Sequence, residues 1–272
     1  MCTLIAIHRG VRGASLIVAA NRDEHYDRPA EGPAIRTLDD LGSQGTGRLV
    51  LAPLDLRAGG TWLGVNAEGV FAAVTNLRDE SPDPRRRSRG LIVMNALCEP
   101  TAARAADMLK ALPEEIYNPF QCFVADREQA FQLSYRERPR LRSLPPGRHV
   151  IGNVDPSEEA SPKVERIRER VAGIEARSLD GALGELAEIC REHVTGGGGV
   201  GDTCVHLGTY GTRSSLLFAL TDGSGLDDTA SRLLFSDGAP CRSEYEDHSP
   251  LLRELRRRAG HGSGETVVRN GS

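Results

Sequence analysis

The first 20 residues contain two apolar segments with a short polar turn between them. Residues 2–8 read Cys-Thr-Leu-Ile-Ala-Ile-His, residues 15–20 read Ser-Leu-Ile-Val-Ala-Ala, and residues 10–13 read Gly-Val-Arg-Gly. Short apolar runs on either side of a glycine-containing turn predict a β-hairpin. Because the first run is apolar at successive positions, its strand is predicted to be buried on both faces.

Further strands and helices are predicted in groups along the chain. Two more hairpins are predicted at residues 59–75 and 120–135, and apolar stripes of helical period mark residues 101–112, 164–174 and 179–190. Shorter segments complete the pattern, namely a helix at 91–97 and strands at 48–51, 149–152, 203–207, 215–220 and 232–235. This order of strands, helices, strands, helices and strands favours an α+β fold, with two packed sheets covered by helices, over alternating βαβ units.

Several segments are predicted as loops or as a tail. Residues 28–58, apart from one short strand, are rich in Gly, Pro and Asp, and residues 78–89 are charged. The arginine cluster within residues 85–89 is interpreted as a solvated loop in preference to an anion site. One domain is predicted over residues 1–242, followed by a tail over 243–272 that is partly disordered.

The composition argues against several classes of protein. A formal net charge of −4 disfavours a nucleic-acid binder, which needs a basic face to neutralise phosphates. Six scattered cysteines without a Cys-x-x-Cys pair predict neither a disulfide framework nor a metal site, and the spacing of Cys204-Val205-His206 alone does not support a metal or haem pocket. No apolar run approaches the ~20 residues that span a bilayer. The N-terminus has no recognisable leader peptide, so a cytoplasmic location is expected. No cofactor is expected.

The cysteine directly after the initiator methionine has unusual chemistry available to it. If Met1 is removed, Cys2 carries both a thiol and an α-amino group whose pKa is about 7.7–8.0, close enough to neutrality for a general base. Nucleophile and base then belong to one residue. The alternative is that Cys2 is only a small apolar residue at the start of a buried strand.

Polar residues stand at the ends of several predicted strands. These residues are Asn21, Asp23, Asn76, Asn153 and Arg213. Taken singly, an asparagine after an apolar strand is usually a turn former. Taken with an N-terminal cysteine, the set resembles an acyl-transfer site, because side-chain amides can donate to an oxyanion and a carboxylate can hold the α-ammonium.

These motifs together resemble the NRDE family, also called the transport and Golgi organisation protein 2 family. The resemblance rests on the following segments: Met1-Cys2-Thr3-Leu4-Ile5, Asn21-Arg22-Asp23-Glu24, Gly59-Gly60-Thr61-Trp62-Leu63-Gly64, Thr75-Asn76, Tyr117-Asn118-Pro119-Phe120 and Tyr210-Gly211-Thr212-Arg213-Ser214-Ser215. That family is in turn similar to the N-terminal-nucleophile hydrolases of the choloylglycine hydrolase and penicillin V acylase branch. The resemblance implies a four-layer αββα sandwich with the mature N-terminus at its centre.

The resemblance also implies roles for individual residues. Cys2 would be the nucleophile and Asp23 would hold its amine, while Asn76 and Asn153 would lie near the oxyanion. Arg213 would support the nucleophile. Asn21, Arg22 and Trp62 are predicted to bind the substrate.

One departure from the hydrolase pattern concerns the early arginine. In the hydrolases an arginine precedes the asparagine, whereas here Ala20 holds that position and Arg22 follows. Successive side chains of a strand point to opposite faces, so Asn21 and Asp23 are predicted to share one face and Arg22 to take the other. The charge that supports the nucleophile is then expected from Arg213 alone.

Two functions follow as hypotheses. The first is an amidohydrolase that uses Cys2 to attack a non-peptide amide or related acyl substrate. The second is a non-catalytic protein on the same scaffold that binds or traffics haem or a lipid or acyl-CoA metabolite. A structural relative with no retained site is the third and least favoured interpretation.

Overall fold

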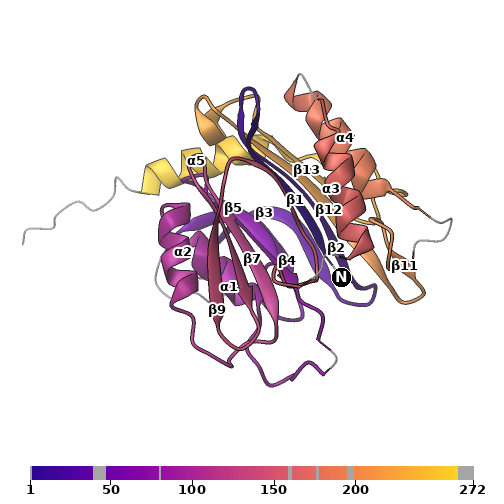
Figure 1. Ribbon diagram of the computed structural model, residues 1–272. Coiled ribbons are helices and arrows are strands. Elements are labelled where there is room, and N and C mark those ends of the chain that lie inside the picture. The colour runs from indigo at the N-terminus through magenta and orange to yellow at the C-terminus, as the bar shows by residue number, and fades with distance from the viewer. Residues whose placement is uncertain are drawn as a thin grey trace, which may run out of the picture.

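The computed structural model describes residues 2–38, 47–79, 81–158, 161–175, 178–194 and 199–262. Two antiparallel sheets pack face to face, and helices cover the outer face of each (Figure 1). The first sheet has the spatial order β10 (Gly147–Ile151), β1 (Thr3–Val11), β2 (Ala14–His25), β12 (Tyr210–Thr221), β13 (Arg232–Ser236) and β14 (Glu246–Asp247), and β11 (His206–Leu207) also pairs with β12. The second sheet has the order β3 (Ala30–Thr37), β4 (Leu49–Asp55), β5 (Leu63–Asn66), β6 (Phe71–Asn76), β7 (Phe120–Ala125), β8 (Ala130–Tyr135) and β9 (Pro139–Leu144).

Two pairs of helices form the outer layers. They are α1 (Gly90–Leu97) and α2 (Ala102–Lys110) on the second sheet, and α3 (Pro162–Ala172) and α4 (Leu179–Arg191) on the first. The predicted αββα arrangement of the α+β fold is therefore confirmed. Within the described residues, no helix is both long and apolar enough to cross a membrane.

Strand β2 illustrates how the sequence pattern produces these layers. Leu16, Val18 and Ala20 pack into the core between the two sheets, whereas Ile17 and Ala19 pack beneath the helices of the first sheet. Both faces of the strand are thus covered, as the continuous apolar run predicts. The hairpin of β1 and β2 lies in the middle of the first sheet, between β10 and β12, so β1 is flanked by a strand on each side from Thr3 onward.

Two strands escape prediction because they lie at the edges of the second sheet. β3 belongs to the segment 28–58, which was predicted as loop apart from one short strand, and its side chains are mostly half-exposed. It carries Pro33 within an irregular register between Glu31 and Ala34, a position that an edge strand tolerates. β9 alternates arginines with apolar residues and is also largely exposed. Edge strands need only one covered side, so they lack the continuous apolar signal of β2.

The segment from Ser243 onward, predicted as a tail, contributes described structure. β14 extends the first sheet, and α5 (Pro250–Gly262) contacts β3, β4 and the 3₁₀ turn η1 (Gly225–Asp227). Leu252 and Leu255 of α5 are fully buried in the core between the sheets. These two leucines lie one helical turn apart among arginines, so the apolar face of the helix is too narrow to be recognised in the sequence. The rest of the predicted tail, residues 263–272, and most of a predicted loop at 196–199 fall outside the described residues.

Candidate active site

The pairing of β1 with β2 brings Cys2 and Arg22 together. Thr3 lies opposite Asn21 in this antiparallel pair, so Cys2, one residue earlier, falls opposite Arg22, one residue later. Opposed residues of neighbouring strands project from the same face. Both line a cavity of about 330 Å³ at the end of the space between the sheets. Arg22 takes the opposite face of β2 from Asn21 and Asp23, as strand alternation predicts, but Cys2 lies on the side of Arg22. Asp23 also contributes to the cavity lining.

A close contact between two glycines shapes the opposite wall of this cavity. A Cβ at Gly60 would lie 2.9 Å from the carbonyl carbon of Gly90, so these two backbones pack directly against each other. The contact joins the segment that carries Trp62 to the start of α1. It thereby brings Arg89, the residue before α1, into the cavity lining with Trp62 and Cys2.

Arg22 is held in place by a ring and a carboxylate. Its guanidinium carbon lies 4.1 Å from the centroid of the Trp62 ring, and its Nη2 lies 3.6 Å from Asp55 Oδ2. Asp55 is shared with Arg28, whose Nε and Nη2 each approach Oδ2 to 2.8 Å. Burial lowers the pKa of Arg22, and the charge of Glu24 opposes this shift. Arg22 therefore presents a fixed positive charge beside Cys2.

Asp23 is a buried carboxylate with two partners on the helix-facing side of β2. Its Oδ1 accepts a hydrogen bond from Thr212 Oγ1 at 2.7 Å, and its Oδ2 lies 4.0 Å from Lys163 Nζ. Burial raises the pKa of Asp23 to about 6, and the charge of Lys163 opposes this rise. Burial also lowers the pKa of Lys163, whose Nζ has no hydrogen-bond partner within the described residues. Two ionisable groups of opposite sign thus share one water-poor site next to Cys2.

The Cys2 thiol ionises less readily than an exposed cysteine thiol. Burial raises its pKa, and the negative charge of Asp23 adds to this rise. A hydrogen bond from the backbone of Asp23 and the charge of Arg22 act in the opposite direction. A thiol in this state needs a base at the moment of attack, because the thiolate is the nucleophile.

Asn76 and Asn153 meet at the end of β6. Asn153 Nδ2 donates to the carbonyl oxygen of Asn76, and the Asn153 carbonyl accepts from the backbone of Arg78 at 2.9 Å. Asn153 therefore holds the strand end and does not itself line the cavity. Asn76 does line it, and its side-chain amide has no partner among the described residues, which leaves it able to donate to a ligand.

Two predicted site residues lie away from the cavity. Asn21 was expected to bind substrate, but its Nδ2 donates to the carbonyl oxygens of Cys190 and Thr203, both at 2.9 Å. It therefore positions the backbone behind β2. Arg213 was expected to support the nucleophile, but the register of β12 shifts between Thr212 and Ser214, which leaves Arg213 as the extra residue of a bulge. Its Nη1 lies 3.5 Å from Asp237, outside the cavity lining.

Several cavity residues were not predicted from the sequence. Of the arginine cluster interpreted as a solvated loop, Arg85 is exposed and paired with Asp83, and Arg87 is also exposed. Arg86, Arg87 and Arg89 all line the cavity. Burial lowers the pKa of Arg89, and the residue has no carboxylate within 4.0 Å among the described residues. Lys163, which lies beside Asp23 and outside the cavity lining, was also missed. It is one of only two lysines in an arginine-rich chain, a compositional signal that could have drawn attention to it.

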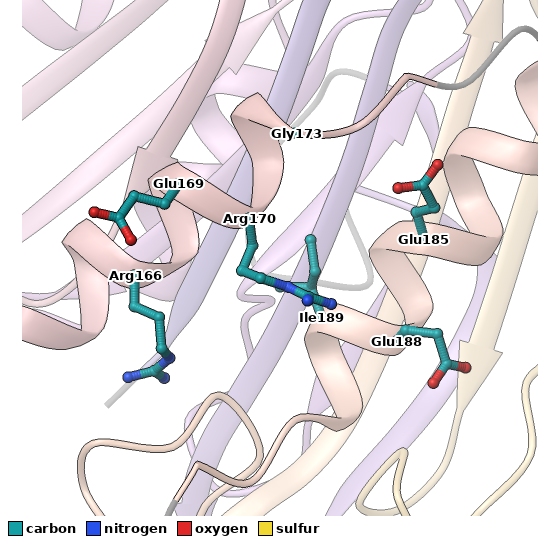
Figure 2. Close-up of a pocket in the computed structure, with 7 residues that line it drawn as sticks. All are labelled: Arg166, Glu169, Arg170, Gly173, Glu185, Glu188 and Ile189. Carbon is teal, nitrogen blue, oxygen red and sulfur yellow. The ribbon is translucent and has the colours of Figure 1, made fainter.

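A second hollow lies between α3 and α4 on the outer surface (Figure 2). It has a volume of about 450 Å³ and is lined largely by charged side chains. Arg170 extends from α3 toward α4, which carries Glu185 and Glu188. It contains none of the predicted site residues. The cavity at Cys2 is therefore the better candidate for an active site, because it is the one that brings a nucleophile, an amide donor and cations together.

The Asp23–Lys163 pair gives a prediction about pH. Because the pKa of Asp23 is raised from 3.8 to about 6, the folded state holds an extra proton between these values. The contribution of this group to stability is full below about pH 4 and is lost as pH rises through 6, a change of about 3 kcal/mol. Lys163→Met removes the cation that opposes the shift, so the pKa should rise further and the loss should extend above pH 6.

The measurement combines carbon NMR of labelled aspartate carboxyls with urea unfolding from pH 4 to 7. Asp23→Asn assigns the resonance and should flatten the pH dependence of the unfolding free energy. Lys163→Arg retains the charge and serves as the matched control. An unchanged Asp23 titration in Lys163→Met would show that the lysine does not act on this carboxylate.

Known proteins resemble this chain in sequence and in fold. A family model described as Transport and Golgi organisation 2 matches residues 1–197. A mouse Transport and Golgi organization 2 homolog is 28% identical over 243 residues, covering 77% of this chain and 83% of the mouse protein. Among solved structures, a penicillin V acylase from Agrobacterium tumefaciens is similar with a TM-score of 0.55 at 14% identity, covering 89% of this chain and 93% of the acylase.

A second solved structure is similar along nearly the whole chain. A variant of conjugated bile acid hydrolase from Clostridium perfringens has a TM-score of 0.56 at 12% identity, covering 92% of this chain and 93% of the hydrolase. At such identities the likeness shows the fold alone, and it confirms the predicted N-terminal-nucleophile hydrolase type of αββα sandwich. Because the family model matches well over half of the sequence, this chain belongs to the Transport and Golgi organisation 2 family.

Proposed function

We propose that this protein is an N-terminal-nucleophile amidohydrolase that acts through Cys2 on a non-peptide amide or related acyl substrate. The observation that carries the proposal is the composition of the cavity, which is lined by Cys2 and by Asn76 with its uncommitted amide, and in which Cys2 lies next to the buried carboxylate of Asp23. A cavity of about 330 Å³ suits a small molecule and not a folded protein.

The reaction begins once Met1 has been removed. The free α-amine of Cys2 takes the thiol proton, and the sulfur attacks the acyl carbon to form a tetrahedral oxyanion that the Asn76 amide stabilises. Asp23 holds the resulting α-ammonium. This ammonium then returns the proton to the leaving amine as the carbon–nitrogen bond breaks, which leaves a thioester on Cys2. Water, deprotonated by the same amine, releases the carboxylic acid and regenerates the thiol.

The charges around the cavity favour a substrate with an anionic group. Arg22 and Arg28 already have Asp55 as a partner. Arg89 donates from Nη1 to the carbonyl oxygen of Pro119 at 3.2 Å and has no carboxylate partner within the described residues. A partly buried cation of this kind is available to a carboxylate or phosphate of the substrate, because guanidinium groups bind both through paired hydrogen bonds.

The experiment that tests this proposal is mass spectrometry of the purified full-length protein before and after incubation with amide and thioester substrates. The expected mass is that of the chain without Met1, and denaturation during turnover should trap an acyl group on the peptide that contains Cys2. Retention of Met1 in the whole sample, or acylation of another cysteine only, would refute catalysis by the N-terminal cysteine.

A second candidate function is non-catalytic binding of an anionic ligand. The ligand would be haem or a lipid or acyl-CoA metabolite. The raised pKa of the buried Cys2 thiol and the several arginines at the cavity favour it. Under this alternative Cys2→Ala leaves ligand affinity unchanged, whereas Arg89→Leu weakens it. Titration with haem and acyl-CoA distinguishes the two candidates, and the absence of saturable binding would count against carriage.

A further inference from the structure

Four side chains with metal-binding atoms meet behind strand β2, outside the cavity of Cys2. His193 follows α4, Cys204 and His206 lead into and begin β11, and Cys241 follows β13. One ligand atom from each side chain lies within 4.8 Å of all the others. The chain therefore brings three separate segments to one point with two thiols and two imidazoles.

The distances among Cys204, His206 and Cys241 are close to those of a tetrahedral metal site. Cys204 Sγ lies 3.5 Å from Cys241 Sγ, and His206 Nε2 lies 3.2 Å from Cys241 Sγ and 3.7 Å from Cys204 Sγ. Zinc bonds of ~2.3 Å to sulfur and ~2.0–2.1 Å to nitrogen place tetrahedral donors roughly 3.3–3.8 Å apart. Both cysteines are free thiols in this structure.

The outer nitrogens of both histidines have polar neighbours. Tyr26 Oη lies 3.3 Å from His206 Nδ1, and Asp202 Oδ2 lies 3.8 Å from His193 Nδ1. Such partners orient a metal-binding imidazole and select the nitrogen that faces the metal. Gly211 makes the first of them possible, since a Cβ there would lie 2.1 Å from Tyr26 Oη.

We propose that His193, Cys204, His206 and Cys241 bind one Zn²⁺ ion in a closed, structural site. Two thiolates with two imidazoles in tetrahedral arrangement suit zinc, and four protein ligands leave no open position for a substrate. Binding converts both thiols to thiolates and releases their two protons to solvent. The ligands come from three segments without a Cys-x-x-Cys pair, which is why their spacing in the sequence does not predict the site.

The position of the site indicates what the ion does. The backbone of Val205, between two of the ligands, donates to Thr212 Oγ1 at 2.8 Å, and Thr212 donates in turn to Asp23. Asn21 donates to the carbonyl oxygen of Thr203, the residue before the first cysteine ligand. The zinc ion therefore fastens the segment that holds Asn21 and Asp23 in place, without contact with the substrate.

The test uses the full-length protein, purified under reducing conditions without added chelator. Elemental analysis should find one equivalent of zinc, and replacement by Co²⁺ should produce the visible and near-ultraviolet absorption of a tetrahedral cobalt–thiolate centre. His193→Ala and Cys241→Ser should each lower zinc affinity more than about 100-fold in competition with a chelator. Cys98→Ser, which removes a partly buried thiol outside the cluster, should leave metal content unchanged.

The variants of His193 and Cys241 change partly exposed residues, so folding of at least one is expected, and the cobalt spectrum of the unmutated protein needs no variant. Three results would overturn the proposal. They are a cobalt spectrum without thiolate charge transfer, zinc content that is equal in all variants, and a Cys204–Cys241 disulfide in the reduced preparation. None of these readouts depends on catalysis by Cys2.

Discussion

Replacement of Cys2 by alanine is expected to lower kcat/KM for an amide substrate by at least about 1,000-fold, because it removes the atom that bonds to the acyl carbon. The small side chain should leave the fold intact, since Cys2 lies at the rim of the cavity and not within the core between the sheets. Steady-state kinetics measure the loss, and far-UV circular dichroism checks the fold. Cys98→Ala is the matched control and should retain full activity.

A second arm of the same experiment tests the α-amine. Protein produced without methionine aminopeptidase retains Met1, so the nitrogen of Cys2 is then in an amide bond and cannot accept a proton. This preparation should be as inactive as Cys2→Ala although its thiol is present. Equal activity with and without Met1 would show that another group, and not the α-amine, serves as the base.

Replacement of Asn76 by alanine is expected to lower kcat by about 10²–10³ with a much smaller effect on KM, as the loss of one oxyanion donor does elsewhere. The reason is that its uncommitted side-chain amide lines the cavity beside Cys2. Pre-steady-state acylation rates measure this step directly. Ser88→Ala alters another cavity residue and should leave kcat within twofold, roughly the range of a neutral substitution. An Asn76→Ala enzyme with unchanged kcat would remove Asn76 from the mechanism.

Asn153→Ala separates a positioning role from direct contact. Asn153 acts on the carbonyl oxygen of Asn76 and does not line the cavity, so its removal should reduce kcat less than removal of Asn76. A larger loss for Asn153→Ala would indicate that it contacts the substrate in a state that differs from this structure.

The central hairpin and its polar end could be predicted from the sequence because both depend on strand alternation. The continuous apolar residues predicted that β1 and β2 are covered on both faces. The two-residue period of a strand predicted that Arg22 points to the opposite face from Asn21 and Asp23. Arg22 was expected to point away from the nucleophile, because this prediction considered β2 without its partner strand β1. Pairing of Thr3 with Asn21 puts Cys2 opposite Arg22, and that register belongs to two strands together.

Other features of the site depend on contacts between segments that are remote in the sequence. Arg89 enters the cavity because Gly90 packs on Gly60, and a charged loop has no periodicity that would indicate such a contact. Arg213 lies outside the cavity because β12 has a bulge at this position. A bulge adds one residue to the strand and redirects a side chain, and the composition of the segment does not reveal it.

The sequence by itself determined the family, the buried central hairpin and the presence of Cys2 beside an Asn-Arg-Asp segment, since these features are local and periodic. The tertiary structure decided which charges face the thiol, that Lys163 meets Asp23, and that two cysteines and two histidines converge. The physical reason is that side-chain direction within a strand repeats every two residues, whereas register, bulges and the packing of loops are set by the whole fold.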